Sequence, residues 1–182
     1  APKKLKKAQR VAEQDGRIYD SGVAMADQLV GRLMDSLRES GLIDNTIVVL
    51  TADHGESLTE NGLMFDHGDD LFEPSLRIPL IIRYPAAARA GHRVPCLVSN
   101  MDVAPTVLGL LGRASGEEVH GVDRSAALGG VRCKDSPLVA TTVMGRFVSP
   151  PPVAHALRVP NQKALRGPSG EDQCFAVGPA VA

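Results

Sequence analysis

Aromatic side chains are scarce in this sequence: they make up 3% of its 182 residues, and tryptophan does not occur at all. Proteins that stack nucleic-acid bases or sugars use aromatic platforms, so this composition argues against that class of binding. An excess of charge of one sign is also lacking, because the formal net charge is −1. No global field therefore draws the protein towards nucleic acid or an anionic membrane.

Cysteine is rare as well, and the three cysteines, Cys96, Cys133 and Cys174, lie far apart without any C-x-x-C spacing. This pattern predicts neither a disulfide framework nor a zinc-thiolate site, and an odd number of cysteines indicates no compartment. No apolar run reaches the length of a membrane span. Apolar residues still make up 43% of the chain, enough for the core of one domain.

The hydrophobic pattern predicts an α/β fold. Apolar side chains recur at three- and four-residue steps from Tyr19 to Leu37, which indicates an amphipathic helix, and Gly41 fits its left-handed C-cap. The runs 46–50 and 78–82 are apolar without polar alternation, so they predict strands covered on both faces, as in a parallel sheet. A second helix is expected over 102–111. Helices that alternate with buried strands are typical of α/β domains.

Beyond about residue 113 the pattern changes to short β-like pieces separated by glycine and proline. These pieces predict a small antiparallel C-terminal subdomain within residues 129–182. The predicted strands are 138–143, 156–159, 163–166 and 174–177.

Polar chemistry follows directly where the first predicted strand ends, in TADHGESLTENGLMFDHGDDLFE (51–73). Ligands of open α/β sheets bind beyond the carboxyl ends of the strands. Asp53 and His54 offer one oxygen and one nitrogen ligand to a divalent cation, and His67 can return over the same place to contact an anion. The alternative is ordinary structure, with an aspartate N-cap and a surface histidine.

Four ordered segments carry a family resemblance: YDSGVAMADQLVGRLMDSL, LIDNTIVVLTADHGESLTENGLMFDHG, LFEPSLRIPLIIRYP and VSNMDVAPTVLGLLG. Together they resemble the C-terminal half of the catalytic domain of sulfatases, in the alkaline phosphatase superfamily. The resemblance implies that 1–128 forms part of an alkaline-phosphatase-like sheet with flanking helices. It also implies hydrolysis of small-molecule or glycan sulfate esters with a divalent metal, most often Ca²⁺, with Mg²⁺ or Mn²⁺ as alternatives.

The same resemblance implies roles for single residues. Asp53 and His54 match the pair that ligates the metal, and His67 matches the basic residue that contacts the sulfate group and shares its developing charge. Arg77 matches a structural arginine, and Asp102 matches a helix start that its carboxylate caps. We assign Asp27, on the first helix, to structure.

The chain departs from the family in its loop and in what it lacks. Thr59 and Asn61 stand where many relatives have Gly and His, and the spacing of Asp66 and His67 is one residue longer than in some members. None of the three cysteines lies in the C/S-x-P-x-R motif that yields the formylglycine nucleophile. The early Asp-Asp ligands are also missing, since Asp69-Asp70 follows the second His-Gly. We therefore expect a fragment of a longer enzyme, inactive alone, with formylglycine in another part.

Two other functions stay open on these residues. A phosphodiester or phosphonate monoester hydrolase, or a phosphoethanolamine-type transferase, of the same superfamily would share the metal-site logic. A truncated, inactive binding domain is the non-enzymatic alternative.

Overall fold

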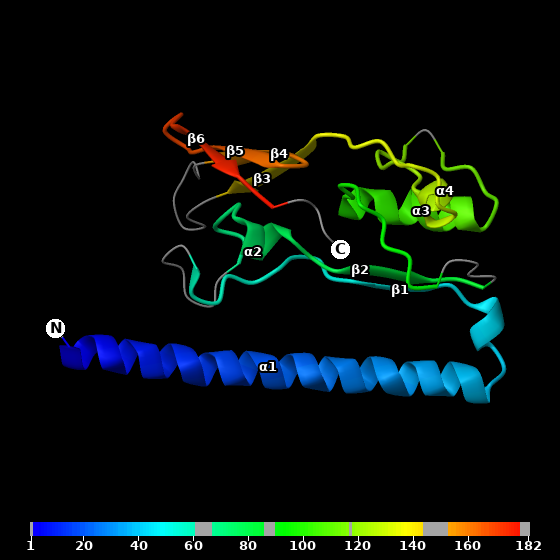
Figure 1. Ribbon diagram of the computed structural model, residues 1–182, viewed down its shortest axis with the longest axis horizontal. Coiled ribbons are helices and arrows are strands. Elements are labelled where there is room, and N and C mark those ends of the chain that lie inside the picture. Colours follow the sequence, from blue (N-terminus) through cyan, green and yellow to red (C-terminus); the bar gives the residue numbers. More distant parts are fainter. Residues whose placement is uncertain (1, 61–66, 86–89, 117, 144–152, 179–182) are drawn as a thin grey trace.

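The computed structural model describes residues 2–60, 67–85, 90–116, 118–143 and 153–178, and side chains only from residue 14 onward. It is a mixed α/β structure, as predicted. In chain order the elements are α1 (Pro2–Glu39), η1 (Ile43–Asn45), β1 (Val48–Thr51), α2 (Glu73–Leu76), β2 (Leu80–Arg83), η3 (Asn100–Asp102), α3 (Val103–Leu110), α4 (Ser125–Leu128), β3 (Leu138–Val143), β4 (Val153–Val159), β5 (Gln162–Arg166) and β6 (Asp172–Ala176). Figure 1 shows α1 along one side of the molecule, with the β3–β6 sheet and α3 on the other.

The first helix confirms the predicted periodicity and is longer than predicted. Gly41 ends it with φ of 66°, and the N–H of Leu42 donates to the carbonyl of Leu37 at 2.9 Å, which satisfies the last turn. The apolar stripe of α1 is largely exposed, for example 53% at Leu29 and 54% at Leu33. No helix in the part of the chain that the structure describes is both long and apolar enough to cross a membrane.

The two predicted strands exist, but the prediction of a parallel, doubly covered sheet is wrong. β1 pairs antiparallel with β2, with Leu50 opposite Ile81. Both of these side chains are exposed, at 39% and 59%. A short apolar run fixes neither the direction of its partner nor whether both its faces are covered, because those depend on distant segments.

The predicted antiparallel C-terminal piece is confirmed as a four-stranded sheet in the order β3-β4-β5-β6. Its inner face carries Ala154 and Ala156, which form the buried apolar cluster with Leu71, and Leu76 and Leu165 pack against them. The sheet therefore covers the segment just before and through α2. The proposed boundary between residues 128 and 129 stays a prediction.

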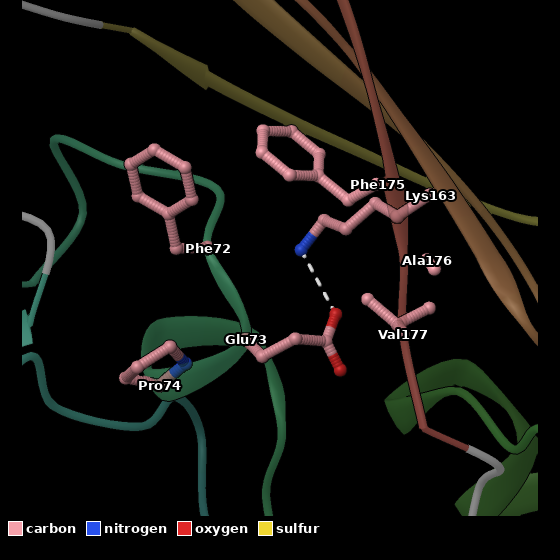
Figure 2. A pocket seen from close by; sticks show the side chains of 7 residues that line it. All are labelled: Phe72, Glu73, Pro74, Lys163, Phe175, Ala176 and Val177. Carbon is pink, nitrogen blue, oxygen red and sulfur yellow. Dashed lines mark hydrogen bonds and ion pairs between the residues drawn. The ribbon is translucent and has the colours of Figure 1, made fainter.

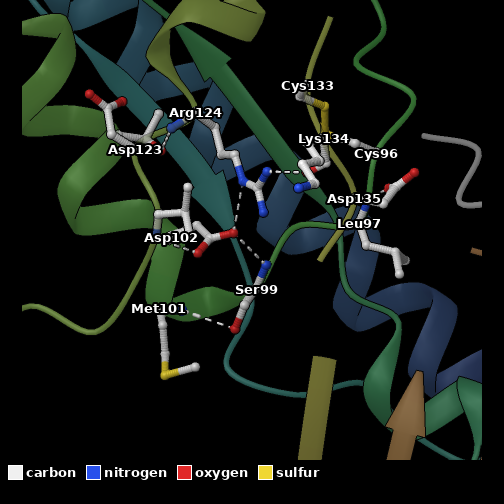
Figure 3. A network of polar contacts seen from close by, with 12 residues as sticks. Cys96, Leu97, Ser99, Met101, Asp102, Asp123, Arg124, Cys133, Lys134 and Asp135 are labelled. Carbon is white, nitrogen blue, oxygen red and sulfur yellow. Dashed lines mark hydrogen bonds and ion pairs between the residues drawn. A yellow bond between two sulfur atoms is a disulfide. The ribbon is translucent and has the colours of Figure 1, made fainter. Parts of the chain in front are cut away.

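A buried polar network holds α3 and α4 together (Figure 3). Ser99 is the N-cap, and Asp102 completes a capping box by accepting from the N–H of Ser99 at 3.2 Å. The same buried carboxylate accepts from the N–H of Val122 at 2.8 Å and from Nε of Arg124 at 3.2 Å. The carboxylate of Asp102 thus caps the start of η3, whose N-cap is Ser99. Asp102 is itself the N-cap of α3, where its side chain makes no cap hydrogen bond.

A disulfide joins Cys96 to Cys133 beside this network, with 6.4 Å between their Cα atoms. The expectation that the cysteines form no disulfide is therefore wrong for this pair. The two residues lie 37 positions apart, and the fold rather than any local spacing brings them together. Cys174 is free and exposed.

Candidate functional site

The candidate site begins where β1 ends, and it is fastened on two sides. The hydroxyl of Thr51 donates to the carbonyl of Pro79 at 2.9 Å, which ties the strand end to the segment before β2. The side-chain amide of Asn100 donates to the carbonyl of Asp53 at 3.2 Å. The backbone around Asp53 is thus held while its side chain remains 87% exposed.

The carboxylate of Asp53 stays ionised more readily than an ordinary aspartate. The N–H of His54 donates to Oδ1 of Asp53 at 3.0 Å, and this hydrogen bond is the main cause that lowers the pKa of Asp53. The nearby imidazoles of His54 and, to a smaller extent, His67 lower this pKa further. Such an exposed, anionic oxygen donor suits a hard divalent cation.

The orientation of His54 also suits a metal ligand. Its Nδ1 lies 2.8 Å from the carbonyl oxygen of Gly55. Because a carbonyl only accepts, Nδ1 carries the proton and Nε2 keeps the lone pair when the ring is neutral. Nε2 lies 3.7 Å from Oδ2 of Asp53, so one cation can contact both groups. A ring whose other nitrogen donates to a backbone carbonyl is the usual arrangement for a metal-binding histidine.

The structure brings His67 to the same place. Its ring stacks on that of His54, with 4.2 Å between the ring centroids and 19° between the planes. Nδ1 of His67 lies 3.0 Å from Oε2 of Glu56, a largely buried carboxylate. The Nδ1 edge of His67 is therefore directed at Glu56. Sequence reasoning missed Glu56, although its place two residues after His54 was a signal that it would lie near the site.

A buried polar cluster lies close by in the sequence, and Asp70 is at its centre. Its Oδ2 accepts from the hydroxyls of Ser57 at 3.1 Å and Ser75 at 2.7 Å, and its Oδ1 accepts from the N–H of Phe72 at 2.7 Å. These contacts give Asp70 a structural role in the described structure. Oδ1 of Asp69 is buried and has no hydrogen-bond partner within the described structure.

The remaining predicted residues lie elsewhere. Arg77 is exposed and ends α2, where its N–H donates to the carbonyl of Glu73 at 2.8 Å. Asp27 is exposed on α1, and Asp102 belongs to the network of α3. Asn61 and Asp66 lie outside the described residues. Within those residues, no group of three or more His, Cys, Asp or Glu side chains is arranged to hold a metal ion. The described site thus offers Asp53 and His54 as two candidate metal ligands.

Comparison with protein families gives a match to the family model described as Sulfatase, over residues 2–113. The choline-sulfatase of Rhizobium meliloti is 40% identical over 104 residues, which are 57% of this chain and 19% of that protein. The N-acetylglucosamine-6-O-sulfatase of Bacteroides thetaiotaomicron is 38% identical over 116 residues, 64% of this chain and 20% of that protein. The chain therefore spans about a fifth of the length of these relatives.

Solved structures give the same result for the fold. One protein, solved in complex with its substrate D-glucosamine-2-N,6-O-disulfate, matches with a TM-score of 0.66 and 29% identity, over 82% of this chain and 31% of its own. The phosphonate monoester hydrolase of Agrobacterium radiobacter matches with a TM-score of 0.72 over 82% of this chain and 32% of its own. Its identity of 21% supports a common fold alone.

Proposed function

Because this chain belongs to the sulfatase family and has part of its alkaline-phosphatase-like fold, we propose that it supplies metal- and anion-binding groups of a sulfate ester hydrolase. The observation that carries the proposal is the arrangement at the end of β1. Asp53 and His54 present an oxygen and a nitrogen within reach of one cation, and His67 stacks on His54. Hydrolysis of a sulfate ester requires cation binding and contact with the sulfate anion at one place.

Asp53 and His54 would hold the divalent cation, for which Ca²⁺ is the first choice and Mg²⁺ or Mn²⁺ the alternatives. When bound, such a cation neutralises charge on the sulfate oxygens and polarises the bond to be broken. The work of this chain is to hold both ligands in place. Gly55 fixes the ring of His54 through its carbonyl, and Asn100 holds the backbone of Asp53. Two ligands alone bind a hard cation weakly, because calcium takes six to eight oxygens.

His67 would contact the sulfate group directly. Its Nδ1 faces the carboxylate of Glu56, which fixes the ring beside that of His54. A donor fixed in this way stabilises negative charge as it develops on the transferred group, without reorganising during the reaction. The stack on His54 keeps the anion contact next to the metal ligands.

The nucleophile and the remaining metal ligands would come from further polypeptide of the same sulfatase domain, where formylglycine is expected. The exposed stripe of α1 supports this part of the proposal. Apolar side chains at Tyr19, Val23, Leu29 and Leu33 remain 40–54% exposed along this helix, which runs along one side of the molecule. A contiguous exposed apolar surface of this kind marks an interaction surface.

The proposed substrate class rests on the sulfatase family as a whole and not on any one relative. The matched relatives are named for choline and N-acetylglucosamine sulfates, which share the sulfate ester and little else. We therefore propose a small-molecule or glycan sulfate ester, and no particular alcohol.

The experiment is a turnover assay of the intact protein that contains this chain, with an aryl sulfate and, in parallel, an aryl phosphonate monoester. Asp53→Ala should lower kcat/KM for the sulfate by at least about a hundredfold, because a metal ligand is lost outright. Asp35→Ala, the same change at an exposed position of the first helix, should leave it unaltered. Equal loss in both variants, no loss in Asp53→Ala, or turnover of the phosphonate alone would contradict the proposal.

A further inference from the structure

The loop that carries Asp53 and His54 rests directly on α2. The N–H of Gly55 donates to the carbonyl of Ser75 at 2.8 Å. A Cβ atom at residue 55 would lie 1.9 Å from the carbonyl oxygen of Pro74, so only glycine allows this close approach. The place of Gly55, and with it that of His54, is therefore set by the place of α2.

α2 is only four residues long, and a charged cluster anchors its first residue to the C-terminal sheet. Nζ of Lys163, on β5, lies 3.0 Å from Oε1 of Glu73, and Nε of Arg158, on β4, lies 3.5 Å from the same oxygen. Figure 2 shows the ammonium group of Lys163 pointing across to Glu73. The side chain of Lys163 is only 2% exposed, whereas that of Glu73 is 35% exposed.

Burial makes this ion pair sensitive to loss of either partner. A buried ammonium group is costly unless an anion compensates it, and Glu73 is the anion that the described structure places beside it. Apolar contacts surround the pair. Phe72 and Phe175 meet edge to face with centroids 6.3 Å apart, and both line a pocket of about 230 Å³ next to Glu73. Glu73 is thus held at one point of the sheet.

We propose that Lys163 is a positioning residue for the metal-binding loop: through Glu73 it fixes α2, and through α2 it fixes Gly55, Asp53 and His54. The C-terminal sheet then acts as the support of the site. In calling this loop a metal site the inference rests on the proposed function, but the series of contacts from Lys163 through Glu73 and α2 to Gly55 does not depend on it.

The test is amide hydrogen exchange of the 182-residue chain, read at the N–H of Gly55, which bonds to α2. The N–H of Ala156, buried in the middle of β4, reports opening of the sheet itself. The variant is Lys163→Met, which keeps the apolar stem and removes the charge. Arg166→Met is the matched control, because Arg166 forms an exposed ion pair with Asp172 on the same sheet.

In Lys163→Met the exchange of Gly55 should become at least about tenfold faster, and that of Ala156 should change less. Arg166→Met should change neither. Glu73→Gln should reproduce the effect from the other side of the contact, which guards against a folding defect of one variant. Unchanged exchange at Gly55 in both variants, or equal acceleration at Gly55 and Ala156, would overturn the inference.

Calcium titration by calorimetry of the intact protein that contains this chain, in which the remaining metal ligands are present, keeps the two proposals apart. Absence of calcium binding, with the exchange result intact, would count against the metal site and leave the positioning role standing. If Lys163→Met weakens calcium binding and Arg166→Met does not, the result would support both the metal site and the positioning role of Lys163.

Discussion

The imidazole ring of His54 lies against that of His67, with ring centroids 4.2 Å apart and planes 19° from parallel. The two residues are thirteen positions apart in the sequence. Gly55 fixes His54 through Nδ1, and Glu56 faces His67 through Nδ1. The two groups that face these rings are thus consecutive residues, so the backbone at 55–56 sets the geometry of both.

Glu56→Ala should change the protonated nitrogen and the orientation of His67. The carboxylate accepts from Nδ1 of His67, and its loss leaves that nitrogen without this acceptor. Long-range ¹H–¹⁵N correlation spectra at pH 8 report which ring nitrogen carries the proton. We expect a protonated Nδ1 in the wild type and a shift towards a protonated Nε2 in Glu56→Ala. Glu56→Gln, whose amide oxygen still accepts, should restore the wild-type spectrum; an identical spectrum in all three proteins would refute the contact.

Gly55→Ala should destabilise the loop after β1. The added methyl group would lie 1.9 Å from the carbonyl oxygen of Pro74, which is backbone and cannot rotate away. Either α2 shifts or the hydrogen bond from Gly55 to Ser75 breaks, at a cost of about 1–3 kcal/mol in the free energy of unfolding. Gly116→Ala is the control, because nothing lies within 4 Å of a Cβ atom there. Urea unfolding of both variants checks this, and equal stability of the two would contradict the close approach.

Asp102→Asn should lower the free energy of unfolding by about 3 kcal/mol, because it leaves the buried guanidinium of Arg124 without its carboxylate. The carboxylate also accepts from two backbone N–H groups, and an amide can satisfy only part of this set. Asp35→Asn, in an exposed pair with Arg38, should cost less than about 0.5 kcal/mol. A loss below about 1 kcal/mol at Asp102 would mean that the network is not cooperative.

The exposed pair of Asp172 and Arg166 predicts a small acid-sensitive contribution to stability. Hydrogen bonds from Arg166, at 2.8 and 2.7 Å, lower the pKa of Asp172 from its ordinary value of 3.8. Because the pKa is lowered in the folded state, the contribution is present above pH 3.8 and is lost as the pH falls through the lowered value. Carbon-13 titration of the carboxyl group should show the pKa of Asp172 rising towards 3.8 in Arg166→Met. No difference between the two proteins would mean that the pair does not form in solution.

Local features of the fold could be predicted from the sequence because each has a local cause. The periodicity of Tyr19 to Leu37 predicts α1, and Gly41 marks its end with the positive φ that the C-cap needs. The alternation of short β-like pieces with glycine and proline predicts the C-terminal sheet. Asp53 and His54 stand out for the same reason, since polar residues directly follow a strand.

Features that depend on distant segments could not be predicted in this way. The antiparallel pairing of Leu50 with Ile81 and the disulfide of Cys96 with Cys133 are set by the fold and leave no spacing signal. The contact of Lys163 with Glu73 joins residues 90 positions apart, and lysine in a strand is ordinarily exposed. Only the structure therefore connects the C-terminal sheet with the loop of Asp53.

The 182-residue chain alone should hydrolyse no sulfate ester. In the proposed roles Asp53 and His54 would hold a cation weakly and His67 would contact an anion, but none of the three cysteines lies in a C/S-x-P-x-R motif. Within the described residues, two candidate metal ligands fall short of a calcium site. Loss of a covalent nucleophile alone costs roughly a millionfold in rate in a well-studied protease, and positioning groups cannot recover this without one. An assay with an aryl sulfate, with Ca²⁺ and Mn²⁺ tested separately, should give the background rate in the wild type and in the double variant Asp53→Ala, His54→Ala. Metal-dependent turnover above that double variant would show that a residue within these 182 serves as the nucleophile.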